Sequence, residues 1–393
     1  MMKLIKKTKN NMSYPTKKLG DCLAQFDRGI SWSRKDEDGA VAVLRIPNIE
    51  EGHINLNDIK HISVKNGNGE LYKNDIVMVA SNGNPDLVGR SALVTEKEKG
   101  MRFASFLIRL RLDNTKLLSQ YAHLFLLTPT FKRELRRKIA TTSGIYNLKK
   151  EHIEKIDIPL PPLQIQKQIV ERLDKIVTAQ KLNEDLIQKS DELFQSLLHK
   201  ELNPAGKKCG IKKLGETFER ITTPILPVKY PNQEFNFIGL ENIESNTGQI
   251  ISMKPTNGKL IKSTKTVFRK NDVLYGKLRP YLNKVWLADD DGICSTDIWV
   301  LRAKENIISP LLLSAILRQS HIVMKSSASM AGANLPRANK DVFDKITIPL
   351  PPLETQKQIV AKLSAVQDYK KQLLGQKSKL KELFNSVLSK SFK

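Results

Sequence analysis

The chain has 393 residues, of which 40% are hydrophobic and 27% charged, a composition typical of a globular protein too long for one core. Its net charge of +24 favours a polyanionic partner, nucleic acid first, and a solvated basic surface is the alternative explanation. No apolar run approaches the ~20 residues that cross a bilayer, so no membrane association is expected.

The N-terminal segment is basic, but no apolar segment follows it, so a signal peptide is not predicted. Residues 1–12 match nothing in the second half of the chain, and Met12 offers an alternative translation start. We therefore expect this extension to be disordered or untranslated. Cys22, Cys209 and Cys294 lie far apart, which indicates reduced thiols and a cytoplasmic protein.

The first domain is predicted over residues 1–155. A strand-like run, Phe106–Leu112, precedes an apolar helical stretch near Leu117–Leu127, so strands and helices mix. Polar loops in this domain are candidate DNA contacts, because Arg and Asn can bond base edges and Lys can hold phosphate. The candidates are Ser81, Asn82, Asn84, Arg90 and Lys149. Solvated loop tips are the alternative.

A duplicated phrase begins the next predicted segment, residues 156–202. Ile156–Ile176 is IDIPLPPLQIQKQIVERLDKI and Ile346–Val366 is ITIPLPPLETQKQIVAKLSAV, with 13 of 21 positions identical at an offset of 190 residues. A repeat of this length indicates one structural unit present twice. The prolines predict an extended exit from a domain, and the last of them suits the first turn of a helix.

The second domain is predicted over residues 203–345 and follows the plan of the first. NDVLYGK (271–277) resembles NDIVMVA (74–80), and short strands again lie among helices, so we predict the α+β class for both domains. The segment KLRPYLNK combines cations, an amide and an aromatic ring, and the loop 334–340 is a secondary candidate. The candidate DNA contacts are Lys277, Arg279, Tyr281, Asn283, Lys284, Asn334 and Arg337.

Two long helices are predicted, from Gln164 to about Lys200 and, in the second repeat segment (346–393), from Glu354 to about Ser391. Apolar residues recur at steps of three and four, which is typical of a coiled-coil seam. The simplest partner of each helix is the other, and two unrelated surface helices are the alternative. The seam residues are Ile169, Leu173, Ile176, Ile187, Phe194, Leu197, Ile359, Leu363, Val366, Leu373, Leu380, Phe384 and Val387.

Polar residues interrupt both predicted seams. They are Gln180, Asn183 and Ser190 in the first helix, and Lys370 and Lys377 in the second. Such interruptions can fix register and pairing at some cost in stability.

Catalytic motifs are missing from the sequence. There is no G-x-x-x-x-G-K-[ST] loop for ATP, no glycine-rich fingerprint after a strand, and no metal-ligand spacing among the six histidines. Asp289–Asp291 could bind a cation, but Gly292 follows, which favours an exposed turn between strands. We therefore predict a binding protein with no catalytic residues and no metal site.

This plan resembles the specificity subunit of type I restriction-modification systems. The two IPLPPL-x-x-Q-K-Q-I-V segments, Ile158–Val170 and Ile348–Val360, carry the resemblance, and Asn271–Val285 is similar to a segment of that family's target-recognition domains. The resemblance implies that each domain recognises half of a split double-stranded DNA site and that the repeated helices pack antiparallel as a spacer.

The resemblance also implies the partners. Two modification subunits would dock on the repeats and methylate adenine with S-adenosylmethionine, and restriction subunits would cleave DNA using ATP and Mg. The chain itself would bind no cofactor and would not be an enzyme.

The geometry of two repeated units agrees with this plan. Two equivalent units in one chain can form a pseudo-twofold, which makes the paired helices antiparallel. A helix of about 37 residues is about 55 Å long, or roughly 16 base pairs, of the order of a gapped site. The alternative hypothesis is a non-catalytic coiled-coil adaptor or a general nucleic-acid-binding protein.

Overall fold

The computed structural model describes residues 14–50, 52–63, 69–142, 144–202, 209–330 and 335–392. The predicted disorder of residues 1–12 falls outside these ranges, and so does the candidate contact Asn334.

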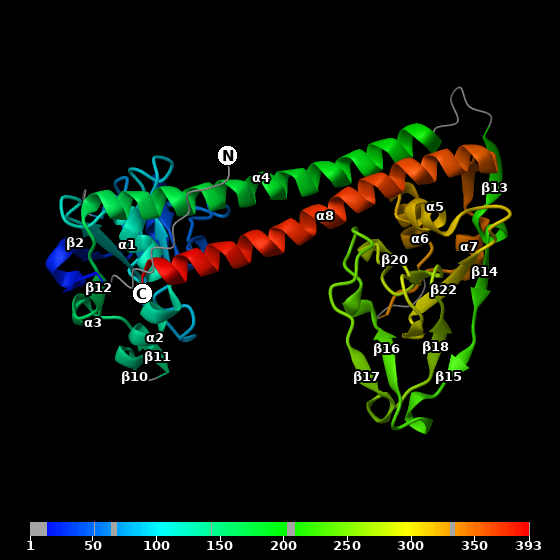
Figure 1. The fold of residues 1–393 in the computed structure, drawn as a ribbon, viewed down its shortest axis with the longest axis horizontal. Helices are drawn as coiled ribbons and strands as arrows, with labels where there is room; N and C mark the ends of the chain where they lie inside the picture. The colour runs from blue at the N-terminus through cyan, green and yellow to red at the C-terminus, as the bar shows by residue number, and fades with distance from the viewer. Residues whose placement is uncertain are drawn as a thin grey trace, which may run out of the picture. The chain divides into compact units, whose positions relative to one another are not determined.

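Two compact units make up the chain. The first contains Met1–Glu184 and Gly375–Lys393, and the second contains Asp185–Leu374. The division passes through two unbroken helices, α4 (Leu163–Leu202) and α8 (Leu353–Ser391), so each unit holds part of both (Figure 1). The sequence limits of the two domains and two repeats stay a prediction.

The first unit is built on a four-stranded antiparallel sheet in the order β2-β9-β5-β7. A second sheet, β4-β3-β8, includes one parallel pair, β3 with β8. The strands and helices are β1 (Thr16–Lys18), β2 (Leu23–Arg28), β3 (Glu37–Leu44), β4 (Lys60–Ile62), β5 (Ile76–Val79), β6 (Ser81–Asn82), β7 (Ser91–Leu93), β8 (Arg102–Phe103), β9 (Leu107–Leu112), β10 (Ala140–Thr142), β11 (Ile145–Asn147), β12 (Asp157–Pro159), α1 (Ser119–Leu126), α2 (Pro129–Lys138) and α3 (Lys150–Glu154).

Strand alternation divides this core into two layers. Ile76 and Met78 of β5 pack in one cluster with α1 and α4, whereas Val77 and Val79 pack in another with the second sheet. Successive side chains of a strand point to opposite faces, so a four-residue apolar strand supplies both layers.

The second unit has a four-stranded antiparallel sheet, β14-β22-β19-β20, and a five-stranded sheet, β15-β18-β21-β16-β17, in which β16 and β21 are parallel. Its strands and helices are β13 (Gly210–Lys213), β14 (Phe218–Ile221), β15 (Pro224–Ile225), β16 (Glu234–Ile238), β17 (Pro255–Asn257), β18 (Lys265–Phe268), β19 (Val273–Gly276), β20 (Val285–Leu287), β21 (Gly292–Cys294), β22 (Ile298–Ala303), β23 (Thr347–Leu350), α5 (Pro310–Leu317), α6 (Ser320–Ala328) and α7 (Lys340–Lys345).

The two units share the topology of the four-stranded sheet, whereas their second sheets have three and five strands. The order β14-β22-β19-β20 repeats β2-β9-β5-β7, and the strand entering each long helix pairs in both units with a strand near the start of its domain, β12 with β1 and β23 with β13. The duplication seen in the repeats therefore extends through the domain interiors. The predicted α+β class, with two domains and two long helices, is confirmed.

A repeated glutamine fixes the start of each long helix to its domain. Gln166 is fully buried, and its Nε2 donates to the Lys116 carbonyl at 3.1 Å. Gln356 is equally buried and donates to the Ile307 carbonyl at 2.9 Å. Each side chain also bonds the proline carbonyl five residues before it, at 2.9 Å in both cases. This accounts for the first glutamine of the repeated QKQ.

The helices pair antiparallel in the second unit. Lys370 Nζ lies 2.6 Å from Asp191 Oδ1, and Lys362 Nζ lies 2.6 Å from Glu201 Oε1, so residue numbers rise on α4 as they fall on α8. In the first unit, Asn183 of α4 is buried and donates to a side chain of α8, the Gln376 Oε1, at 3.2 Å. The polar interruptions Asn183 and Lys370 thus have partners across the seam.

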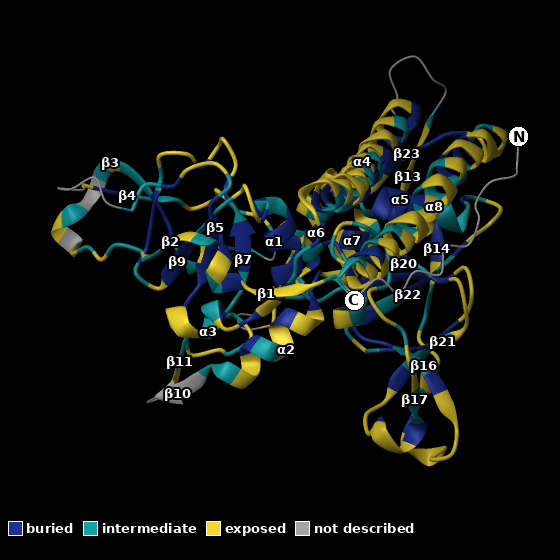
Figure 2. Ribbon diagram, turned by 60° about the vertical axis from the view of Figure 1, so that its left-hand side comes forward, coloured by how far each residue is buried: buried dark blue, intermediate teal, exposed yellow. Residues whose placement is uncertain are grey.

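All the predicted seam residues are buried or partly buried. Several also belong to the domain cores: Leu173 packs in the cluster of α1, and Leu363 packs in that of α5. The outer faces of both helices are exposed (Figure 2). The seam therefore joins helix to helix and helix to domain with the same side chains.

We predict that the Asp191–Lys370 pair contributes measurable stability, because the Lys370 side chain is only 11% exposed. A double-mutant cycle with Asp191→Ala and Lys370→Ala should give a coupling of about 1 kcal/mol in denaturant unfolding. The control is the Glu184–Lys377 pair, whose side chains are both more than half exposed and should couple by about 0.3 kcal/mol. Equal coupling in the two pairs would contradict the prediction.

Candidate nucleic-acid interface

The turn between β19 and β20 in the second unit is the most constrained candidate segment. A short 3-10 helix, Pro280–Leu282, lies between Arg279 (φ 51°) and Asn283 (φ 49°), both left-handed. A left-handed conformation costs a residue with a side chain about 1–2 kcal/mol, so other contacts must hold it. Non-glycine residues held in this way cluster at functional sites.

The segment after α6 supplies some of these contacts. Arg279 N donates to the Pro336 carbonyl at 2.8 Å, and Ala338 N donates to the Lys277 carbonyl at 2.8 Å. Leu278 also forms an isolated antiparallel bridge with Arg337. The structure therefore joins the two segments of the second domain that the sequence singled out separately.

Three candidate side chains of this unit have partners inside the protein. Asn283 is buried and donates from Nδ2 to the Arg318 carbonyl at 3.1 Å. Lys284 Nζ donates to the Leu240 carbonyl at 2.6 Å. Arg337 Nε donates to Asp297 Oδ1 at 2.9 Å. These contacts hold the turn in shape.

Arg279 and Tyr281 point outward instead. Both are exposed, Lys277 is partly exposed, and none of the three side chains has a polar partner within the described part of the chain. A free guanidinium can make two hydrogen bonds to a guanine edge, and a phenol can bond or stack.

The first unit builds its candidate surface in the same place. β6 pairs with β11, which brings Ser81 beside Asn147 and connects the loop after β5 to the loop before α3. The Ser81 hydroxyl donates to Asn147 Oδ1, and Ser81 is buried. Asn82 Oδ1 accepts from Asn84 N at 2.8 Å, which shapes the turn and leaves the amide nitrogen as a donor.

Two basic candidates of the first unit have no polar side-chain partner among the residues described. Arg90 is partly exposed just before β7, and Lys149 is exposed just before α3. Arg90 is equivalent to Lys284, since its carbonyl accepts from Val79 N at 2.8 Å as that of Lys284 accepts from Gly276 N at 2.8 Å. The strands of the two hairpins are therefore equivalent, but the connecting loops differ, with β6 in the first and the 3-10 helix Pro280–Leu282 in the second.

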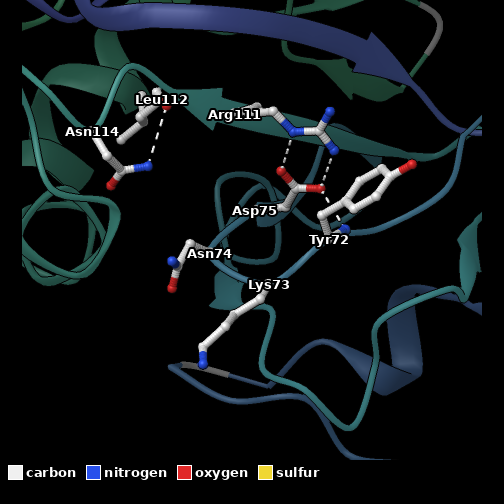
Figure 3. Close-up of a pocket in the computed structure, with 7 residues that line it drawn as sticks. All are labelled: Tyr72, Lys73, Asn74, Asp75, Arg111, Leu112 and Asn114. Carbon is white, nitrogen blue, oxygen red and sulfur yellow. Dashed lines mark hydrogen bonds and ion pairs between the residues drawn. The ribbon is translucent and has the colours of Figure 1, made fainter.

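An ion pair with a buried carboxylate recurs at the start of β5 and of β19, the strand ends opposite the candidate turns. Asp75 accepts from Arg111 Nε and Nη2 at 2.7 and 2.8 Å, and Asp272 accepts from Arg302 at 2.8 Å twice. The first pair lines a pocket of about 300 Å³, and its guanidinium lies 4.6 Å from the centre of the Tyr72 ring. Figure 3 shows the side chains that line this pocket. The pair satisfies its own charges and recurs in both units, so we assign it to the scaffold.

Groups that would support catalysis are not assembled in the described residues. They contain no cluster of three or more His, Cys, Asp or Glu side chains able to hold a metal. The predicted exposed turn at Asp289–Asp291 lies between β20 and β21. Cys294 is buried, and burial raises its pKa to about 12, which makes the thiol unreactive. No helix within the described ranges is long and apolar enough to cross a membrane.

The family model for the type I restriction modification DNA specificity domain matches this chain twice, at residues 14–189 and 207–382. Because the two matches cover most of the sequence, the chain belongs to this family, whose members are recognition components and not enzymes.

Two curated relatives are specificity subunits of type I restriction enzymes. That of EcoDI from Escherichia coli is 30% identical over 171 residues, 42% of this chain and 37% of that protein. That of EcoKI from Escherichia coli strain K12 is 26% identical over 187 residues, 45% of this chain and 40% of that protein. The chain therefore spans less than half the length of the relatives it matches.

Two solved structures share the fold over nearly the whole chain. One, from work on complex assembly and conformational transition of a type I R-M system, has a TM-score of 0.60 at 15% identity and covers 98% of this chain and 99% of its own. The other, the S subunit of M. genitalium, has a TM-score of 0.58 at 15% identity and covers 98% of both chains. At such identity the likeness establishes the fold alone.

Sequence reasoning missed the residues that hold the candidate loops. Asp297 and Arg318 lie outside the candidate segments, yet each bonds a candidate residue. Their sequence separations from these partners are 40 and 35 residues, so no local pattern signals them.

Proposed function

We propose that this chain is the DNA-recognition subunit of a type I restriction-modification complex, with each domain contacting one half of a gapped double-stranded site. The observation that carries the proposal is the pair of hairpins on equivalent strands, β5–β7 and β19–β20, whose loops present different polar side chains. One scaffold with two sets of contacts suits a site with two different halves. The net charge of +24 suits the phosphate backbone.

We divide the candidate residues by whether the side chain still has a polar group available to bond DNA. Asn82, Asn84, Arg90, Lys149, Lys277, Arg279 and Tyr281 are the proposed direct contacts. We propose that Ser81, Asn283, Lys284 and Arg337 hold the loops in shape and do not contact DNA directly, because each already bonds a group inside the protein. Phosphate contacts would position the protein, and contacts with base edges would specify the sequence.

The partners belong to the same proposal. Two modification subunits would methylate adenine with S-adenosylmethionine, and restriction subunits would cleave DNA with ATP and Mg, in the cytoplasm. Exposed apolar residues at repeat-equivalent positions support two equal docking surfaces. Leu193 is 50% exposed and Leu383, at the 190-residue offset, is 48% exposed. Leu163 and Leu353 form a second such pair, at 39% and 41%.

The function is tested by comparing the methylome of the source strain with and without this gene. Loss of N6-methyladenine from one gapped, two-part motif is the expected result. An unchanged methylome in a strain that expresses the complex would contradict the proposal and favour a coiled-coil adaptor.

Arg279→Ala should weaken recognition at one half-site only, by roughly 1–3 kcal/mol, if its guanidinium bonds a base edge. The assay is binding by the assembled methyltransferase to sites altered in either half. The control is Arg269→Ala, which removes an exposed arginine at the other end of β19. An equal loss on unrelated sequences would show that Arg279 contacts phosphate.

Leu193→Lys and Leu383→Lys should each remove one modification subunit from the complex, and the double substitution should remove both. A lysine at the centre of an apolar contact must be desolvated, which opposes docking. Native mass spectrometry of the complex measures the stoichiometry. The control is Leu182→Lys, since Leu182 is 60% exposed on α4 but its repeat equivalent is Gln372. A full complement of subunits in the double variant would refute the docking surface.

A further inference from the structure

Arg318 lies directly after α5 and contacts two other parts of the second unit. Its Nη1 donates to the Thr247 carbonyl at 2.5 Å, and its guanidinium lies 5.3 Å from the centre of the Phe194 ring of α4. Burial lowers the pKa of Arg318 from its ordinary value, and the carboxylate of Asp191 opposes that shift. The Arg318 side chain is partly buried, and withdrawing a guanidinium from water needs a structural reason, because desolvating a charge is costly.

Contacts with the turn between β19 and β20 provide that reason. The Arg318 carbonyl accepts from Asn283 Nδ2 at 3.1 Å, and the Asn283 carbonyl accepts from Asn246 N at 3.1 Å. Asn246 and Thr247 are consecutive. Arg318 therefore contacts the end of the hairpin in two ways: its carbonyl bonds Asn283 directly, and its guanidinium bonds the turn 246–248, which bonds Asn283. Asn283 is one of the two left-handed residues that define the shape of the turn.

Gly248 allows this approach. Its φ is +72°, and a Cβ at this position would lie 2.3 Å from Arg318 Nη1. Any side chain here would displace the guanidinium.

The first unit has a different residue in the equivalent place. Leu127 directly follows α1 as Arg318 follows α5, and it lies beside Gly52, which has a φ of +93°. A Cβ on that glycine would be 3.6 Å from Leu127 Cδ1, an ordinary contact. The turns match as well, since Ile49 bridges Ile54 as Ile243 bridges Ile250. The fold therefore accepts leucine at this position, and the arginine serves a purpose specific to the second domain.

We infer that Arg318 is a positioning residue for DNA recognition, which holds the turn 279–283 so that Arg279 and Tyr281 face the DNA. The inference rests on the proposed function. Without the guanidinium, the Thr247 carbonyl loses its donor and the turn 246–248 loosens. The hydrogen bond from Asn246 to Asn283 then weakens, and the left-handed residues relax toward ordinary conformations.

Arg318→Leu tests the inference, because leucine already occupies the equivalent position in the first domain. The assembled methyltransferase is assayed on its cognate site and on sites with one base changed in either half. Discrimination at the half-site of the second domain should fall by about tenfold, while discrimination at the other half-site stays unchanged. Affinity for unrelated DNA and its salt dependence should stay unchanged too, because the phosphate-binding cations remain.

Two further variants separate positioning from folding. Gly248→Ala keeps the arginine but displaces its guanidinium, and should reproduce the loss. Arg318→Lys keeps a donor for the Thr247 carbonyl and should restore part of the discrimination. Thermal unfolding of each variant confirms that the domain is folded at the assay temperature.

The outcomes are distinct. Wild-type discrimination in Arg318→Leu at both half-sites would overturn the inference, and so would an equal fall at both half-sites or no rescue by lysine. A wild-type complex that recognises no gapped site would instead overturn the proposed function.

Discussion

The core of each unit closes only when a helix from the other repeat joins it. In the first unit, Val387 and Leu388 of α8 lie in one cluster with Leu173 of α4 and Tyr121 of α1. The ring of Phe392 lies 4.9 Å from that of Tyr121, so the last turn of the chain packs into the first domain. Each such side chain contributes about 1.5–3 kcal/mol by burial, and the first half of the sequence lacks all those of α8.

The second unit depends on the same exchange, with Phe194 and Leu198 of α4 in the cluster of α5. Apolar contacts alone would tolerate a shift of one helix along the other by a turn. Asn183 and Lys370 prevent such a shift, because out of register each buried polar group would lose its partner. Register and domain stability are therefore set by the same seam.

Much of this architecture could be predicted because its signals are local. The duplicated PLPPL phrase, the steps of three and four, and the strand-like run Phe106–Leu112 are all patterns over a few residues. The hairpin interior could not be predicted, since the direction of the Asn283 side chain depends on Arg318, 35 residues away. Asn283 and Arg279 look alike as candidate contacts in the sequence KLRPYLNK, and only long-range packing turns one inward and leaves the other exposed. The repeated Gln166 and Gln356 were visible as identities, but their bonds to domain carbonyls required the fold.

The difference between polar side chains turned inward and those left exposed explains how a protein with an excess of cations can be selective among DNA sequences. Lysines and arginines distributed over the surface attract any DNA, so charge by itself gives affinity without discrimination. Selectivity requires a few donors held in fixed directions, and holding them costs energy that the scaffold must supply. Here a partly buried guanidinium and a set of main-chain bonds hold one short turn with its two left-handed residues. Because the strands that carry the turn repeat in both units while its supporting contacts do not, a change of these contacts would, on the proposed function, alter the recognised sequence without altering the fold.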